Sequence, residues 1–168
     1  MRTLFLLLCL ANIAVAVGMN WWMPDPMGTH FGAGNQADGF MSPAGFAVFI
    51  SGFVALFATG VLIVPWLVRV LPASGWRMPN REFWMSEENR PRTARRFRSF
   101  FESVGIALML LFLLIQWLTF HANRTAPPQI NMPIFWCGFV GFLAVFAMLM
   151  VRFYVSFRLP KKTDAEIQ

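Results

Sequence analysis

The chain has 168 residues, of which 57% are apolar and 13% are charged, against about 45–50% apolar and about 25% charged residues in soluble domains. A water-soluble fold of this composition would leave large apolar patches on its own surface, so length and composition exclude an ordinary soluble globule and indicate a single membrane domain. The 14 Lys and Arg residues outnumber the 8 Asp and Glu residues. On so apolar a chain, excess positive charge indicates anionic lipid headgroups and membrane orientation ahead of nucleic acid.

Four apolar stretches are long enough, or nearly long enough, for the roughly 20 helical residues that cross a hydrocarbon core about 30 Å thick. They cover residues 3–19, 43–70, 99–120 and 133–157. The first resembles a secretory signal with a small-residue cleavage site, and we expect it to be retained as a true span. The sequence therefore predicts an all-α integral membrane protein with four transmembrane helices, connected by an outer loop 20–42, a basic loop 71–98 and a second outer loop 121–132, and followed by a tail 158–168.

The basic residues predict the orientation, because cytoplasmic loops collect Lys and Arg. All of them except Arg124 lie at Arg2 or in the segments 69–98 and 152–162, while the loop 20–42 has none. We therefore expect both termini and the middle loop on the cytoplasmic side, an N-in/C-in arrangement, in the inner membrane of a bacterium.

Few polar residues interrupt the apolar spans, although intramembrane polar groups are the default place to look for function. Asn12 and Gln116 are expected to fix helix packing through interhelical hydrogen bonds. Glu102, Arg152 and Arg69 are expected at similar depth, so Glu102 is predicted to pair with one of the two arginines, as a packing clamp or as part of a proton or substrate relay.

The outer loop 20–42 is long for a segment without regular structure, which is typical of a functional loop or a lid. Ser42-Pro43 predicts the start of a helix, with Ser as cap and Pro at the first position. His30 is a candidate ligand or acid–base group with Asp25 or Asp38 as partner; the simpler alternative is a histidine hydrogen-bonded within the loop. A metal site made by His30 and His121 is the least favoured interpretation, since two histidines and stray carboxylates meet by chance. We expect no metal and no cofactor.

The same loop carries a family resemblance. The order Met23-Pro24-Asp25, Thr29-His30-Phe31 and Asp38-Gly39-Phe40 between two spans is similar to the N-terminal module of SdpI-like immunity proteins, a family of domains of unknown function, and the segment 78–85 resembles a stretch of its short four-span members. The resemblance implies a multi-span protein that protects its cell from a secreted toxic peptide and holds a transcriptional repressor at the membrane. It makes Asp25, Thr29, His30, Phe31 and Asp38 the candidate partner- or ligand-binding residues.

The basic loop 71–98 divides into two parts. The aromatic segment 78–85 is expected at the membrane interface, and a helix is expected to begin within 86–98, where Ser86 or Asn89 can cap it and Pro91 fits a first turn. A basic collar continuous with the third span would bind anionic lipid headgroups or an acidic protein partner; it consists of Arg92, Arg95, Arg96 and Arg98.

No phosphate-binding glycine loop, nucleophile elbow, paired catalytic carboxylates or Cys/His cluster occurs in the sequence. The leading hypothesis is therefore a non-enzymatic SdpI-like membrane protein that acts by protein–protein contact through its outer loop, in an immunity- or signalling-like role. The alternative is a small accessory subunit of a larger membrane complex, such as a respiratory or oxidase assembly. The expected partners are anionic lipid and another membrane protein or subunit, and not nucleic acid.

Overall fold

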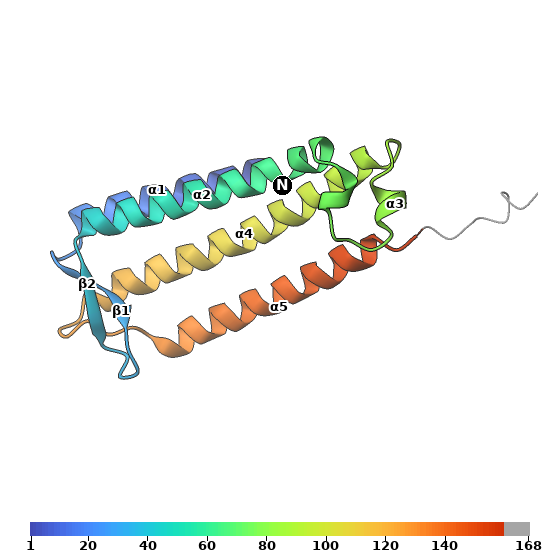
Figure 1. Ribbon diagram of the computed structural model, residues 1–168. Helices are drawn as coiled ribbons and strands as arrows, with labels where there is room; N and C mark the ends of the chain where they lie inside the picture. The colour runs from blue at the N-terminus through green and yellow to red at the C-terminus, as the bar shows by residue number, and fades with distance from the viewer. Residues whose placement is uncertain (160–168) are drawn as a thin grey trace, which may run out of the picture.

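Four long helices make up most of the protein in the computed structural model, which describes residues 1–159 (Figure 1). They are α1 (Arg2–Gly18), α2 (Pro43–Val70), α4 (Arg90–Ala122) and α5 (Met132–Ser156). Each is long and apolar enough to cross a membrane, in line with the expected helical class. Lys161, Lys162 and most of the expected tail 158–168 lie outside the described residues.

Capping explains where two of these helices begin. The Ser42 hydroxyl accepts a hydrogen bond from the Gly45 N–H at 3.0 Å, directly before the Pro at the start of α2, so α2 covers the expected residues 43–70. The Asn131 side chain accepts from the Ile134 N–H at 3.1 Å and begins α5 in the same way.

The third long helix begins well before the expected span 99–120. Its N-cap is Asn89, whose side chain makes no capping hydrogen bond, and Pro91 falls in its first turn. The basic collar is therefore part of a continuous helix, as the sequence predicts.

Helices α1, α2 and α4 pack against one another, and α5 packs mainly against α4 (Figure 1). The main core lies among the first three helices and includes the buried side chains of Phe5, Ile50, Val54 and Met109. Gly105 lets α1 and α4 approach closely, because a Cβ there would lie 2.6 Å from the ring of Phe5. By contrast, none of the residues of α5 is buried.

A second core closes the end of the bundle at which α2 ends and α4 begins. We call this the arginine-rich end, and it also holds two short helices, η2 (Ala73–Gly75) and α3 (Arg81–Trp84). Its buried members are Val68, Trp84, Met85, Ala94, Phe97 and Phe157. Within the segment 78–85, which is expected at a membrane interface, Trp84 and Met85 are only 4% exposed, and Trp84 packs on Phe157 and Phe83.

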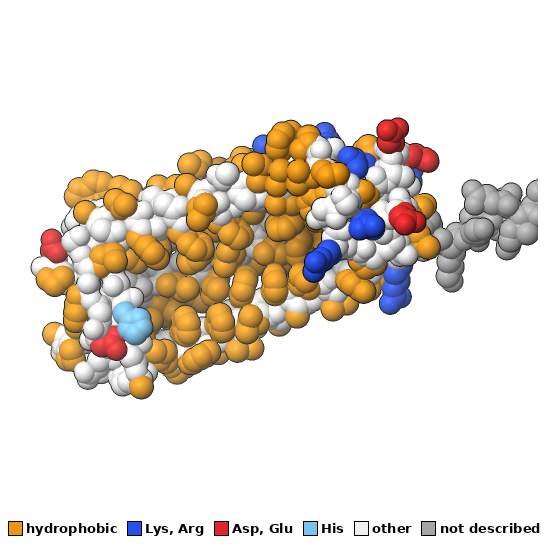
Figure 2. Space-filling model, in the orientation of Figure 1, with side chains coloured by type: hydrophobic (Ala, Val, Ile, Leu, Met, Phe, Trp, Pro, Cys, Tyr) orange, Lys and Arg blue, Asp and Glu red, His pale blue; other side chains and the backbone are white. Residues whose placement is uncertain are grey.

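The opposite end carries a β-hairpin that the sequence analysis did not predict. After a single 3-10 turn, η1 (Met19–Trp21), the strands β1 (Met27–Phe31) and β2 (Ala37–Met41) pair antiparallel. Figure 2 shows charged side chains at the two ends of the molecule and a largely hydrophobic surface between them. The hairpin lies across the end of the bundle at which α1 and α4 finish and α5 begins (Figure 1).

Candidate functional site: the hairpin platform

The hairpin is fixed to the bundle through β1. The Gly28 N–H donates to Oδ1 of Asn123 at 2.6 Å, and Nδ2 of Asn123 donates to the Gly28 carbonyl at 2.8 Å. A second bond from Nδ2 to the Thr119 carbonyl, at 2.9 Å, ties the same side chain to the last turn of α4. Asn123 therefore satisfies both backbone groups of Gly28 and sets the hairpin on the end of α4.

The second strand and the turn are fixed by the loop between α4 and α5. The Ala37 N–H donates to the Pro128 carbonyl at 3.0 Å, and the Ile130 N–H donates to the Asn35 carbonyl at 3.0 Å. Gln36 and Gln129 pair as an isolated β-bridge. The two loops that the sequence analysis placed on one side of the membrane thus form a single unit, which we call the hairpin platform: residues 27–41 together with 123–130.

Small residues permit the close pairing of the two strands. A Cβ at Gly39 would lie 2.8 Å from Cβ of His30, and one at Gly28 would lie 2.6 Å from Cβ of Ala37. The turn between the strands places Asn35 in the left-handed region at φ 62°, a conformation that Asn adopts more readily than most residues.

His30 and Asp38 face each other across the hairpin, with Nδ1 and Oδ1 2.5 Å apart. Their side chains are 76% and 56% exposed, and they are the one pair of a basic and an acidic side chain within 4.0 Å in the described part of the chain. Figure 2 shows a histidine beside an acidic side chain at this end of the molecule. Of the two partners considered for His30, the structure therefore selects Asp38.

The other three candidate residues of the outer loop do not join this pair. Thr29 and Phe31 are half-buried on either side of His30, and Asp25 is exposed before β1 begins. Successive side chains of a strand point to opposite faces. The platform therefore presents His30 and its partner Asp38 to solvent, while Thr29 and Phe31 lie partly against the protein.

The second histidine, His121, lies against aromatic rings near the end of α4. Its ring centroid is 4.5 Å from that of Trp117 and 5.5 Å from that of Phe120. Within residues 1–159, no three or more His, Cys, Asp or Glu side chains gather closely enough to hold a metal ion. The structure thus assigns His30 and His121 to different partners.

The predicted pairing of Glu102 with an arginine is wrong. Glu102 is 6% exposed, yet neither Arg69 nor Arg152 lies within 4.0 Å of its carboxylate. Because side chains three and four residues apart share a helix face, Glu102 lies on the face of Gly105, which meets α1. Arg152 is on α5 and lines a hollow together with Ser99 and Ser103 of α4, and Glu102 is not part of that lining.

The basic collar also divides by environment. Arg92, Arg95 and Arg98 are exposed, whereas Arg96 is half-buried. The guanidinium carbon of Arg96 lies 3.9 Å from the ring centroid of Trp84, and Nη1 donates to the Ser156 carbonyl at the end of α5. Arg96 therefore clamps the α3 segment and α5 against α4, a role that its position in a run of arginines does not indicate.

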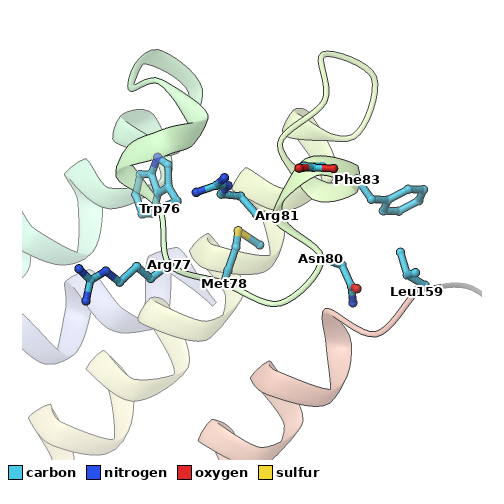
Figure 3. A pocket seen from close by; sticks show the side chains of 8 residues that line it. Trp76, Arg77, Met78, Asn80, Arg81, Phe83 and Leu159 are labelled. Atoms are coloured by element: carbon cyan, nitrogen blue, oxygen red, sulfur yellow. The ribbon is translucent and has the colours of Figure 1, made fainter.

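The end of α5 is held by two further donors. Nε1 of Trp84 donates to the Phe157 carbonyl at 2.8 Å, and Nδ2 of Asn80 donates to the same oxygen at 2.9 Å. Beside them lies an open hollow of about 430 Å³. Figure 3 shows Trp76 and Arg81 on one side of this hollow, and Phe83 and Leu159 on the other.

Comparisons of the chain with protein-family models, with curated proteins and with solved structures found no match. The resemblance to SdpI-like proteins stays a prediction.

Proposed function

We propose that the chain is a non-enzymatic, multi-pass protein of the bacterial inner membrane, with both termini in the cytoplasm, that acts by contact with another protein through the hairpin platform. The observation that carries the proposal is the anchoring of the hairpin on both strands, through Asn123 and through the backbone of residues 128–130. A fixed, solvent-exposed surface is preorganised for binding, because little conformational entropy is lost when a partner docks.

The composition of the platform supports contact more than catalysis. The His30–Asp38 pair is largely open to solvent, where water screens the electrostatic stabilisation that a reacting group needs. Phe40, which is on β2 with Asp38, is 55% exposed. An exposed aromatic ring on the strand that carries the Asp38 carboxylate is the kind of surface that recurs in protein interfaces.

The SdpI-like resemblance supports the same assignment, because its Pro-Asp, Thr-His-Phe and Asp-Gly elements all fall in or directly before the hairpin. A partner that binds the outer face would be a secreted peptide or the outer domain of another membrane protein. Immunity- and signalling-like roles both use such a contact.

A photoreactive amino acid placed at Phe40 tests this proposal in growing cells. We expect one discrete protein adduct, whose yield falls when Asp38→Ala removes the partner of His30. Asn20→Ala is the matched control, since Asn20, in η1, is exposed at the same end and, among residues 1–159, its side chain bonds only to the Val17 carbonyl of α1. Absence of a protein adduct, or equal loss in both variants, would contradict the proposal.

The alternative role, a small accessory subunit of a larger membrane complex, is favoured by α5. This helix packs mainly on α4 and has no buried residue, so most of its circumference is free to meet lipid or another subunit. Purification in mild detergent followed by mass measurement separates the two roles. Stoichiometric co-purifying subunits, with protein adducts from a photoreactive residue at Met148, would favour the accessory role; a monomer or homo-oligomer would contradict it.

A further inference from the structure

An apolar groove runs between α4 and α5 and is open to the surface. Its volume is about 460 Å³. Aliphatic and aromatic side chains of both helices form its walls, and they include Ala107, Leu110, Leu114, Phe142 and Val145. A Cβ placed on Gly141, which also lines the groove, would meet no atom within 4 Å. The groove is therefore open space at this point and has not been filled by a neighbouring side chain.

The groove continues into a polar hollow at the arginine-rich end. This hollow has a volume of about 320 Å³ and shares Met1, Ser103 and Leu149 with the apolar groove. Its polar lining consists of Arg96, Arg152, Ser99, Ser103 and Ser156. The groove and the hollow thus form one continuous depression, which is apolar along the groove and carries two arginines at its end.

The two arginines leave that end without a balancing charge. Within residues 1–159, no carboxylate lies within 4.0 Å of Arg96 or Arg152. Arg96 is held in place by its stacking on Trp84 and its bond to Ser156. Two guanidinium groups that line one hollow are suited to an anion that accepts several hydrogen bonds, and phosphate is one of the two anions whose geometry matches arginine.

The length of the apolar part identifies the kind of anion. On α4 the lining residues extend from Ser103 to Leu114, about 16 Å of helix at 1.5 Å per residue. One leaflet of a hydrocarbon core about 30 Å thick is of the same length. A soluble phosphate would occupy the hollow alone, whereas a phospholipid would fill the hollow and the groove together.

We propose that the groove between α4 and α5 binds one anionic phospholipid, with its phosphate between Arg96 and Arg152 and an acyl chain along Gly141 and Leu114. The phosphate-binding hollow lies at the opposite end of the molecule from the hairpin platform, and no platform residue lines the hollow or the groove, so this proposal is independent of the partner contact. It also differs from general attraction to headgroups, which would involve all exposed arginines equally.

Native mass spectrometry of the full chain in mild detergent tests the site, with phosphatidylglycerol or phosphatidylcholine added separately. We expect one phosphatidylglycerol to stay bound under conditions that remove phosphatidylcholine. Arg152→Gln should weaken that binding about tenfold, since it removes a charged hydrogen-bond donor. Arg98→Gln, an equal charge change on an exposed part of α4, should leave the affinity within about twofold.

A second pair of variants tests the groove without changing charge. Gly141→Leu places a side chain in the open space and should reduce phosphatidylglycerol binding about tenfold. Gly52→Leu, on α2, also has open space at its Cβ position but lies outside the groove, and it should have no effect. Equal retention of the two lipids, equal loss in Arg98→Gln and Arg152→Gln, or displacement of the lipid by soluble glycerol phosphate would overturn the proposal.

Discussion

Nε2 of Gln116 on α4 donates a hydrogen bond to Oδ1 of Asn12 on α1 at a distance of 2.8 Å, and both side chains are fully buried. Asn12 in turn donates through Nδ2 to the Leu8 carbonyl at 2.8 Å and to the Met109 carbonyl at 3.1 Å. These bonds join α1 to α4 in a part of the bundle that is otherwise apolar. Asn12 and Gln116 therefore fix the relative position of the two helices, as interhelical polar contacts do in membranes.

Replacing Asn12 tests that role. Asn12→Leu should lower the free energy of unfolding by about 0.5–2 kcal/mol, because it leaves both polar atoms of the buried Gln116 amide without a partner among residues 1–159, where Oε1 already has none. Unfolding in mixed micelles measures the change. The double variant Asn12→Leu, Gln116→Leu should lose less free energy of unfolding than the two single variants lose together. Additive losses would show that the two side chains do not stabilise each other and would contradict their assigned role.

Removing Asn123 should detach the hairpin from the bundle. Asn123→Ala takes away both hydrogen bonds to Gly28, at a cost of about 1–3 kcal/mol for the buried backbone groups left unpaired. We expect faster amide hydrogen exchange across 27–31 and 37–41, with unchanged exchange in the middle of α4. Asn20→Ala serves as control, and equal hairpin exchange in the two variants would contradict this role of Asn123.

The two tryptophans of the arginine-rich end form a matched pair. Trp84→Phe removes the donor to the Phe157 carbonyl and should destabilise the protein by about 0.5–1.5 kcal/mol beyond the loss of ring area. Nε1 of Trp76 is buried and bonds to no acceptor among residues 1–159, so Trp76→Phe loses no hydrogen bond. Thermal unfolding should rank Trp84→Phe below Trp76→Phe in stability; the reverse order would contradict the assigned role of Trp84.

The long helices were predictable because their signals are local. Apolar length indicates each span, and the pair Ser42-Pro43 fixes the start of α2 to the residue. The hairpin was missed because neither MGTHF nor ADGFM alternates clearly between apolar and polar residues. Its stability comes from Asn123 and Pro128, which lie about ninety residues away in the sequence and give no local signal of contact with it.

The candidate site residues could be predicted only where a local signal in the sequence indicates the contact. Asp25 and Asp38 both lie close to His30 in the sequence and both carry a carboxylate that a histidine can bond, so Asp38 was one of two partners expected for His30. For Glu102 and Arg152, the distance along each helix indicated equal depth, but depth does not determine which face of α4 a residue occupies. Arg96 shows the same limit, since its stacking on Trp84 depends on how the α3 segment folds back over α4.

We propose that the hairpin platform and the arginine-rich end lie on opposite sides of a membrane. Single cysteines at Asn35, in the hairpin turn, and at Glu87, before α4, test it in a background with Cys9 and Cys137 replaced by Ala. A membrane-impermeant thiol reagent added to cells with a permeabilised outer envelope should label the cysteine at position 35 at once, and the one at position 87 only after the inner membrane is opened. Immediate labelling at position 87 with protection at position 35 would contradict the orientation and the outward contact surface that depends on it.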